Sequence, residues 1–312
     1  MKAVVFREFG GPEVLHVAEL PDPVPGPEDV VVRVAAATVN PTDLMMRSGV
    51  QADRMRDLVP PYICGQEFSG HVHAVGSPST RLSPGLRVMG IVHPRRPQGG
   101  AYAELVCVPQ ASVVQVPDSL DLVDAATIPM NGMTARVALE TLALRPGQAL
   151  LVTGGAGSLG GYVIQIASNA GIVVVADAKD EDRDLLHRLG TRHVVARGPQ
   201  MAAAVRALYP DGVDALVDCA LLGDEAAPLV RASGGIASVR TAQKFATPGR
   251  TVSHVGVMEQ IRNTDWLTAL AAQARRNVIT PRVARRLPMT QAAEAHRIVE
   301  RGGLRGRMVL TF

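Results

Sequence analysis

The segment at residues 150–161 (LLVTGGAGSLGG) constrains the fold of this chain more than any other. An apolar run ends at a turn where Gly154, Gly157 and Gly160 recur at every third position, and an apolar series at helical spacing starts at Leu159. This order predicts a buried strand, a tight turn and a helix. Glycines let the backbone approach a pyrophosphate closely, and the helix N-terminus offers N–H groups and partial positive charge to its oxygens.

We therefore expect a dinucleotide to bind at this turn; the alternative is a turn that is only structural. The helix leads through Gly171 into a second apolar strand at 172–176, which ends at Asp177, and this context favours the nucleotide. The residues expected to bind it are Gly154, Gly155, Ala156, Gly157, Ser158, Leu159 and Gly160.

The residues after the second strand leave the choice of nicotinamide cofactor open. A carboxylate at Asp177 accepts from a ribose 2′-hydroxyl and repels a 2′-phosphate, which favours NAD(H). Lys179 and Arg183 follow closely, and either can pair with a 2′-phosphate if Asp177 points away, which favours NADP(H).

The rhythm of the chain changes near residue 124. Before it, short apolar runs separated by glycine and proline turns predict a partly closed β-barrel. After it, helical and strand patterns alternate and predict a doubly wound parallel sheet. The predicted helices span 124–142, 158–170, 180–189 and 200–208, and the predicted strands span 149–153, 172–176, 193–196, 213–219 and 235–240.

The tail from residue 277 contains a predicted helix at 290–301 and a last strand at 307–312, which is too little for a separate domain. We expect it to return to the β domain. The predicted division is therefore a catalytic domain of residues 1–123 and 277–312 and a dinucleotide-binding domain of residues 124–276. The cleft between two domains is the default place for an active site.

Composition excludes several classes of function. The net charge is only +3 and aromatic residues make up 3% of the chain, which argues against nucleic-acid binding. No apolar run reaches the roughly 20 residues that a membrane span needs. The start of the chain is too polar for a signal peptide. Three cysteines far apart fit a reducing cytoplasm.

Short motifs run from one end of the chain to the other. They stand at residues 1–3 (MKA), 39–43 (VNPTD), 65–70 (GQEFSG), 99–104 (GGAYAE), 128–135 (IPMNGMTA) and 306–310 (GRMVL). With the glycine turn, they resemble the zinc-independent medium-chain dehydrogenases/reductases, in the quinone oxidoreductase (zeta-crystallin-like) branch. The resemblance implies an α/β protein with a GroES-like β-barrel domain and a Rossmann domain. The chain departs from the motif at Ser158, where the family prefers glycine.

The resemblance also bears on metal binding. Asn40 and Gln66 stand where the zinc branch carries a cysteine and a histidine, and an amide is a poor zinc ligand. His71 and His73 share one strand face, and surface or core histidines are the alternative to a chelating pair. We predict no metal.

Four more expectations follow for the catalytic site. Asn40 is expected to donate to the acceptor oxygen, against the alternative of capping a turn before Pro41. Asp43 is expected to bond local backbone N–H groups. Thr127 and Thr134 are expected to contact the nicotinamide end of the cofactor.

Three residues are expected on the substrate side of the site. Met45 and Met46 are expected to form an adaptable apolar wall or, alternatively, ordinary core. His93 lies in a loop that, by family position, borders the substrate, where it can donate a proton; a solvated loop histidine is the alternative. Residues 47–61 have the composition of a lid.

Together these patterns predict a metal-free reductase that transfers hydride from a nicotinamide to a quinone or an α,β-unsaturated carbonyl. The resemblance favours NADP(H), so NADP(H) and NAD(H) both stay open. The alternatives are an enoyl-thioester (CoA or acyl-carrier) reductase and a non-catalytic cofactor-binding relative. We also expect a homodimer that pairs sheet edges near the apolar run 252–258.

Overall fold

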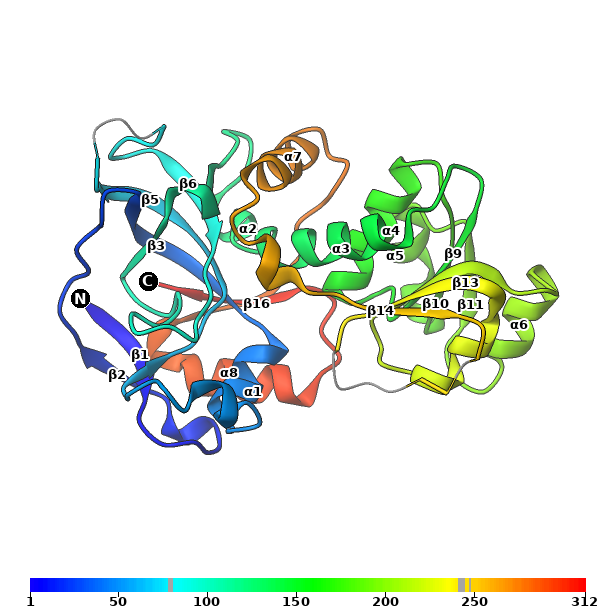
Figure 1. Cartoon of the computed structure of the whole chain (residues 1–312), viewed down its shortest axis with the longest axis horizontal. Coiled ribbons are helices and arrows are strands. Elements are labelled where there is room, and N and C mark those ends of the chain that lie inside the picture. Colours follow the sequence, from blue (N-terminus) through cyan, green and yellow to red (C-terminus); the bar gives the residue numbers. More distant parts are fainter. Residues whose placement is uncertain (78–80, 241–244, 247) are drawn as a thin grey trace. The chain divides into compact units, whose positions relative to one another are not determined.

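The computed structural model describes residues 1–77, 81–240, 245–246 and 248–312 (Figure 1). It divides into two compact units. Unit 1 comprises Met1–Met130, Met258–Arg276 and Pro281–Phe312, and unit 2 comprises Asn131–Val257 and Asn277–Thr280. The predicted boundaries at 123/124 and 276/277 remain a proposal.

Unit 2 contains, in its described residues, a sheet of six parallel strands in the order β11-β10-β9-β12-β13-β14. The strand order reverses beside β9, so the carboxyl end of β9 lies at the topological switch point, where doubly wound sheets bind ligands. The strands are β9 (Ala149–Thr153), β10 (Val173–Ala178), β11 (His193–Ala196), β12 (Val213–Asp218), β13 (Val230–Ser238) and β14 (Thr251–His254).

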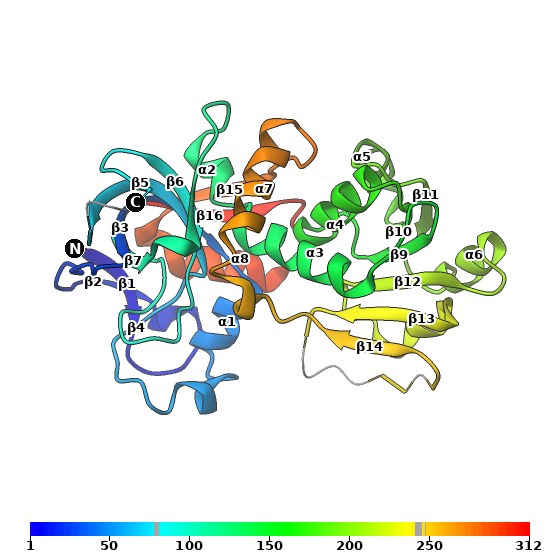
Figure 2. The ribbon, with the colours of Figure 1, turned by 45° about the horizontal axis from the view of Figure 1, so that its top comes forward.

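Helices connect the strands of this sheet, and α4 packs on β9 and β10 (Figure 2). All five residues of β9 are buried, as a central parallel strand requires. The helices are α3 (Pro129–Leu142), whose first two residues belong to unit 1, α4 (Ser158–Asn169), α5 (Arg183–Arg188) and α6 (Met201–Leu208).

Unit 1 contains, among the residues that the structure describes, a seven-stranded and a three-stranded sheet. In the first, β15-β16-β3-β5-β6-β8 run side by side and β7 pairs with β3; in the second, the order is β2-β1-β4. The strands are β1 (Lys2–Phe6), β2 (His16–Glu19), β3 (Asp29–Val39), β4 (Tyr62–Ile63), β5 (Glu67–Val75), β6 (Arg87–Ile91), β7 (Leu105–Pro109), β8 (Val113–Gln115), β15 (Val283–Pro288) and β16 (Arg307–Thr311).

Four α-helices accompany these sheets in the described part of unit 1. They are α1 (Pro41–Arg47), α2 (Leu122–Ala125), α7 (Thr264–Arg275) and α8 (Ala292–Arg301). In the two units together, short 3₁₀ turns lie at Pro12–Val14, Ala52–Met55, Gln110–Ser112, Asp180–Asp182, Gly223–Glu225, Ala227–Leu229, Val257–Gln260 and Met289–Gln291. No helix of the described chain is long and apolar enough to cross a membrane.

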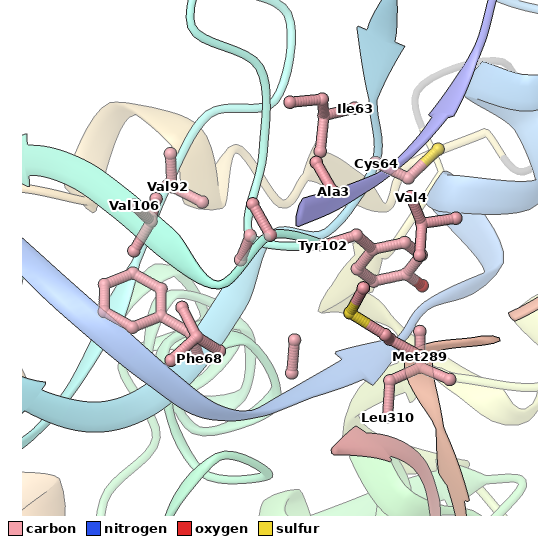
Figure 3. Close-up of a cluster of buried hydrophobic side chains, with 14 of the residues drawn as sticks. Ala3, Val4, Ile63, Cys64, Phe68, Val92, Tyr102, Val106, Met289 and Leu310 are labelled. Carbon is pink, nitrogen blue, oxygen red and sulfur yellow. The ribbon is translucent and has the colours of Figure 1, made fainter. Parts of the chain in front are cut away.

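The core of unit 1 gathers side chains from both ends of the chain. Figure 3 shows Val4 of β1 and Leu310 of β16 near the ring of Tyr102, which is fully buried. The first and last strands thus share one apolar core, which explains why the tail folds with the N-terminal β structure.

The expected α/β architecture, a β domain and a doubly wound parallel sheet, is confirmed. The single helix predicted at 124–142 is wrong, because the structure has α2 and α3 with residues 126–128 between them. Pro129 begins α3, and a proline disfavours helical backbone in the residue before it. The sequence patterns also do not predict α7 or β15.

Candidate functional site

The glycine turn joins β9 to α4 in a conformation that depends on its glycines. Gly154 has φ +68°, in the left-handed region. A Cβ on Gly160 would lie 2.4 Å from the carbonyl oxygen of Gly154. Helix and turn therefore approach each other more closely than any side chain at position 160 permits.

The same turn presents the N-terminus of α4. Gly157 is the N-cap, its N–H donates to Gly154 O at 2.9 Å, and no side chain of the described residues caps the helix. The amides of Ser158, Leu159 and Gly160 form the first turn. This arrangement of small residues and aligned N–H groups at a switch point fits a pyrophosphate. It brings together the seven turn residues that the sequence predicts to bind a dinucleotide.

Asp177, on β10, faces this turn and is fully buried. Its Oδ1 accepts from Gly154 N–H at 2.6 Å, and its Oδ2 accepts from Arg197 Nε at 2.6 Å. Lys179 and Arg183 lie apart from this contact: Lys179 is 3.9 Å from Glu181 and Arg183 is 3.8 Å from Asp180.

Sequence reasoning missed Arg197. The signal that could have found it is sheet register, because Ala196 at the end of β11 is paired with Ala178 at the end of β10. A residue just after β11 therefore lies beside the residues that end β10.

In unit 1, a buried carboxylate, Glu67 of β5, accepts hydrogen bonds from three parts of the chain. Its Oε1 accepts from Arg307 at 2.6 Å and from the Thr38 hydroxyl, and its Oε2 accepts from Met130 N–H at 2.7 Å. Arg307, at the start of β16, also donates to Asn40 Oδ1 at 2.6 Å. The charge of Glu67 is thus neutralised by a guanidinium, and both are buried.

Asn40 joins this network from the end of β3. Its amide Nδ2 makes only long contacts, 3.2 Å to Thr38 Oγ1 and 3.4 Å to Glu67 Oε1. Asn40 is also the N-cap residue of α1. It therefore both caps the turn before Pro41 and contacts the side chains around Glu67. Its place as a donor to a substrate remains a prediction.

Asp43 has the structural contacts that the sequence suggests. Its carboxylate accepts from the backbone N–H of Asn40 at 2.8 Å and of Gly65 at 2.9 Å. Burial raises the pKa of Asp43 to about 6, although these two N–H groups and Arg307 lower it and so oppose the rise. Asp43 therefore ties α1 to the segment before β5.

Gln66 lies beside Glu67 and donates through Nε2 to the hydroxyl of Thr42. No group of three or more His, Cys, Asp or Glu residues that could hold a metal ion occurs in the described chain. His71 and His73 are both exposed on β5.

His93 follows β6 and is half-buried. Its Nδ1 accepts from the backbone N–H of Arg95 at 3.1 Å, and its Nε2 lies 3.3 Å from the Arg95 guanidinium. Burial, with the charges of Arg95 and Arg96, lowers the pKa of His93 below its ordinary value. The imidazole is therefore neutral at neutral pH, and its role as a proton donor remains a prediction.

The other expected site residues lie in both units. Thr127 is buried and donates to Asp124 O at 2.8 Å. Met46 belongs to the unit 1 core, whereas Met45 is half-buried on α1. Thr134 is half-buried on α3. Contacts of these four residues with a cofactor or substrate remain predictions.

Two family descriptions match the chain. The alcohol dehydrogenase GroES-like domain matches residues 26–118, and the zinc-binding dehydrogenase domain matches residues 189–310. A solved NAD-dependent alcohol dehydrogenase is 30% identical, with a TM-score of 0.89 over 100% of both chains. Human quinone oxidoreductase is 26% identical over 99% of this chain and 97% of its own. The chain belongs to the medium-chain dehydrogenases/reductases, and quinone oxidoreductases are among the relatives that it matches over nearly its whole length.

Other relatives widen the comparison. The quinone oxidoreductase from Coxiella burnetii is 28% identical with a TM-score of 0.88, over 100% of this chain and 99% of its own. A mycobacterial protein complexed with NADPH is 27% identical with a TM-score of 0.85, over 100% of both chains. The human synaptic vesicle membrane protein VAT-1 homolog-like is 33% identical over 72% of this chain, and the match spans only 52% of that relative. A trans-enoyl reductase of Aspergillus flavipes is 30% identical over 68% of this chain and 64% of its own. Several of these relatives are named as oxidoreductases, dehydrogenases or reductases.

Proposed function

We propose that this family member reduces quinones or α,β-unsaturated carbonyls with NAD(P)H and without a metal. The observation that carries the proposal is the glycine turn, in which Gly160 lets α4 pack closely on Gly154 and small residues surround the N-terminus of the helix. Bound there, a nicotinamide nucleotide supplies the hydride. The turn and α4 contribute binding and orientation through backbone N–H groups.

In unit 1, we assign to Asn40 the donation of a hydrogen bond to the acceptor oxygen. Its Oδ1 is held by Arg307 at 2.6 Å, whereas the contacts of its Nδ2 are long. An incoming oxygen that carries developing negative charge competes well for such an N–H group. One donor of this kind lowers the activation free energy by about 3–4 kcal/mol in favourable cases.

The absence of a catalytic metal is part of the proposal. Asn40 and Gln66 offer amides, and both side chains have hydrogen-bond partners, in Arg307 and Thr42 respectively. Glu67 is a carboxylate that could bind a cation, but it already pairs with Arg307. Such a donor set suits neutral or anionic oxygens better than Zn²⁺.

The relationship to trans-enoyl reductases keeps an enoyl-thioester substrate as the second candidate. Arg95 and Arg96 are basic residues of the loop that contains His93. Arg95 donates to Gln51 Oε1 at 2.6 Å and Arg96 to Gly99 O at 2.8 Å. These local bonds argue against a free basic rim for a CoA phosphate, so the quinone or enone is preferred.

A homodimer and a cytoplasmic location complete the proposal. Strand β14 lies at one edge of the six-stranded sheet, and an edge strand can pair with the same strand of a second copy. The three cysteines are free thiols, which suits a reducing compartment. Light scattering of the purified chain tests the dimer.

The activity test measures oxidation of NADPH and of NADH with 1,4-benzoquinone, a simple enone and crotonyl-CoA. We expect turnover with the first two acceptors and little with the thioester, and no stoichiometric zinc by elemental analysis. Asn40→Ala is expected to lower kcat about 100-fold while nucleotide binding is kept. Nucleotide binding without turnover on any acceptor supports the non-catalytic alternative instead.

A further inference from the structure

The pairing of Asp177 with Arg197 changes what the end of β10 can recognise. Asp177 is completely buried, and its two oxygens accept from Gly154 N–H and Arg197 Nε, each at 2.6 Å. A ribose 2′-hydroxyl needs an accessible acceptor oxygen at this corner, and this carboxylate exposes none. The acidic residue that would ordinarily favour NAD(H) is therefore occupied with holding the glycine turn.

Arg197, in contrast to Asp177, is partly exposed and keeps donors that the contact with Asp177 does not use. The contact with Asp177 uses Nε, and the side chain is 44% exposed. Among the described residues, no acceptor is found for its two terminal nitrogens. A guanidinium presents its donors in a planar fork that suits phosphate oxygens. The Asp177 bond fixes one edge of the fork and leaves the other edge for a ligand.

The remaining cations of this corner are less well placed for the task. Lys179 and Arg183 are exposed and pair with Glu181 and Asp180. Arg183 also donates to Val194 O at 3.1 Å. Arg197 alone in this group contacts a residue that itself bonds the glycine turn, so its position is linked to that of the nucleotide phosphates.

We propose that Arg197 is the specificity-determining residue of the nucleotide site and that it selects NADP(H) by pairing with the 2′-phosphate. This inference rests on the proposed nucleotide site and deepens it. Asp177 neutralises part of the guanidinium charge and orients it, so it serves here as a positioning residue and does not repel the 2′-phosphate as a free carboxylate does.

The test measures dissociation constants of the full chain for NADPH, NADH, 2′,5′-ADP and 5′-AMP by calorimetry. The two fragments differ by the 2′-phosphate alone. We expect wild type to bind NADPH at least about tenfold more tightly than NADH. Arg197→Gln should weaken NADPH and 2′,5′-ADP binding about tenfold or more, and change NADH and 5′-AMP binding by less than about threefold.

Arg192→Gln is the matched control, because Arg192 is exposed at the other end of β11 and its loss changes net charge equally. It should leave all four constants within about twofold of wild type. Arg197→Lys keeps the charge without the fork and should give an intermediate loss, which also covers the case in which Arg197→Gln does not fold.

The outcomes separate the two proposals. If both dinucleotides bind but Arg197→Gln leaves their ratio unchanged, or if wild type prefers NADH, the assignment of Arg197 is overturned and the proposed function stands. If neither dinucleotide binds, the proposed function fails and this inference fails with it.

Discussion

Glu67 Oε1 lies 2.6 Å from the guanidinium of Arg307, a residue 240 positions later in the chain. The two meet because β16 pairs antiparallel with β3, and β3 pairs with β5. The ion pair, with Thr38 and Asn40 around it, joins the last strand to the centre of the seven-stranded sheet. Arg307 of this ion pair also holds Asn40, the proposed hydrogen-bond donor to the substrate. The same contacts therefore stabilise unit 1 and orient the proposed catalytic residue.

Loss of one partner of this ion pair should destabilise unit 1. Arg307→Met leaves the buried Glu67 carboxylate without its counter-charge, and we expect the free energy of unfolding to fall by about 3–5 kcal/mol. Urea denaturation followed by the fluorescence of Trp266 measures it, because Trp266 is the single tryptophan and belongs to unit 1.

The control for that measurement is the double variant Glu67→Gln with Arg307→Met. Removing both charges should recover part of the loss, because no uncompensated buried charge remains. Equal losses in the single Arg307 variant and the double variant would show that the ion pair itself contributes little.

The close approach at the glycine turn gives a second prediction. In Gly160→Ala, the new Cβ lies 2.4 Å from Gly154 O, so α4 or the turn must shift. We expect NADPH binding to weaken about tenfold or more, with a loss of a few kcal/mol in stability at most. Gly157→Ala is the milder comparison, since its Cβ lies 3.2 Å from the same oxygen. A Gly160 variant that binds as tightly as the Gly157 variant would contradict the role assigned to the close contact.

The dinucleotide half of the fold was predictable because its determinants are local. Strand β9 is apolar throughout and is ended by glycines, and the prediction for 149–153 matches its bounds. By contrast, α7 carries many small alanines and one N-cap, Asn263, so its apolar stripe is weak in sequence. β15 contains exposed Arg285 and Arg286, a pattern typical of an edge strand and not of a core strand.

The buried networks could not be read from the chain for a different reason. Glu67 and Arg307, or Asp177 and Arg197, come together only once the strand order and register are set. The motif suggested Asn40 as a site residue, but not that Arg307 would hold its Oδ1. Local patterns fix elements and turns, whereas side-chain pairing across a sheet depends on topology.

A third prediction concerns His93. Burial and the nearby Arg95 and Arg96 lower its pKa, so it is neutral across the neutral range. We expect that this neutral imidazole does not supply the proton, so His93→Gln should keep kcat/KM for 1,4-benzoquinone within about threefold of wild type. The pH profile of kcat/KM should lack an inflection near 6–7 that depends on this residue. A profile whose inflection disappears in His93→Gln would establish His93 as a proton donor.

The final prediction uses two buried groups of unit 1 that share the Tyr102 hydroxyl. Tyr102 Oη lies 3.4 Å from Asp43 Oδ2 and 3.4 Å from His296 Nε2. Burial raises the pKa of Asp43 from 3.8 to about 6. Burial and the charge of Arg47 lower the pKa of His296 from 6.5 to about 3. The two shifts have opposite consequences for stability.

Between about pH 3 and 6.5, the unfolded chain holds a proton on His296 that the folded chain lacks, so the His296 contribution to stability is lost as the pH falls. Between 3.8 and about 6, the folded chain holds the extra proton on Asp43, so the Asp43 contribution is lost as the pH rises. The two therefore offset each other in the wild type over the shared range.

Removing either group should reveal the pH dependence of stability that the other group contributes. Relative to wild type, His296→Gln should become more stable as the pH falls from 6.5, and Asp43→Asn should become more stable as the pH rises from 3.8 to 6. Each trend can reach about 1.4 kcal/mol per pH unit. Urea unfolding followed by Trp266 fluorescence at pH 4, 5, 6 and 7 measures both variants, and trends of the same sign would refute the assignment of opposite shifts. Because both residues contact one hydroxyl, the double variant should show whether their proton equilibria are coupled or merely adjacent.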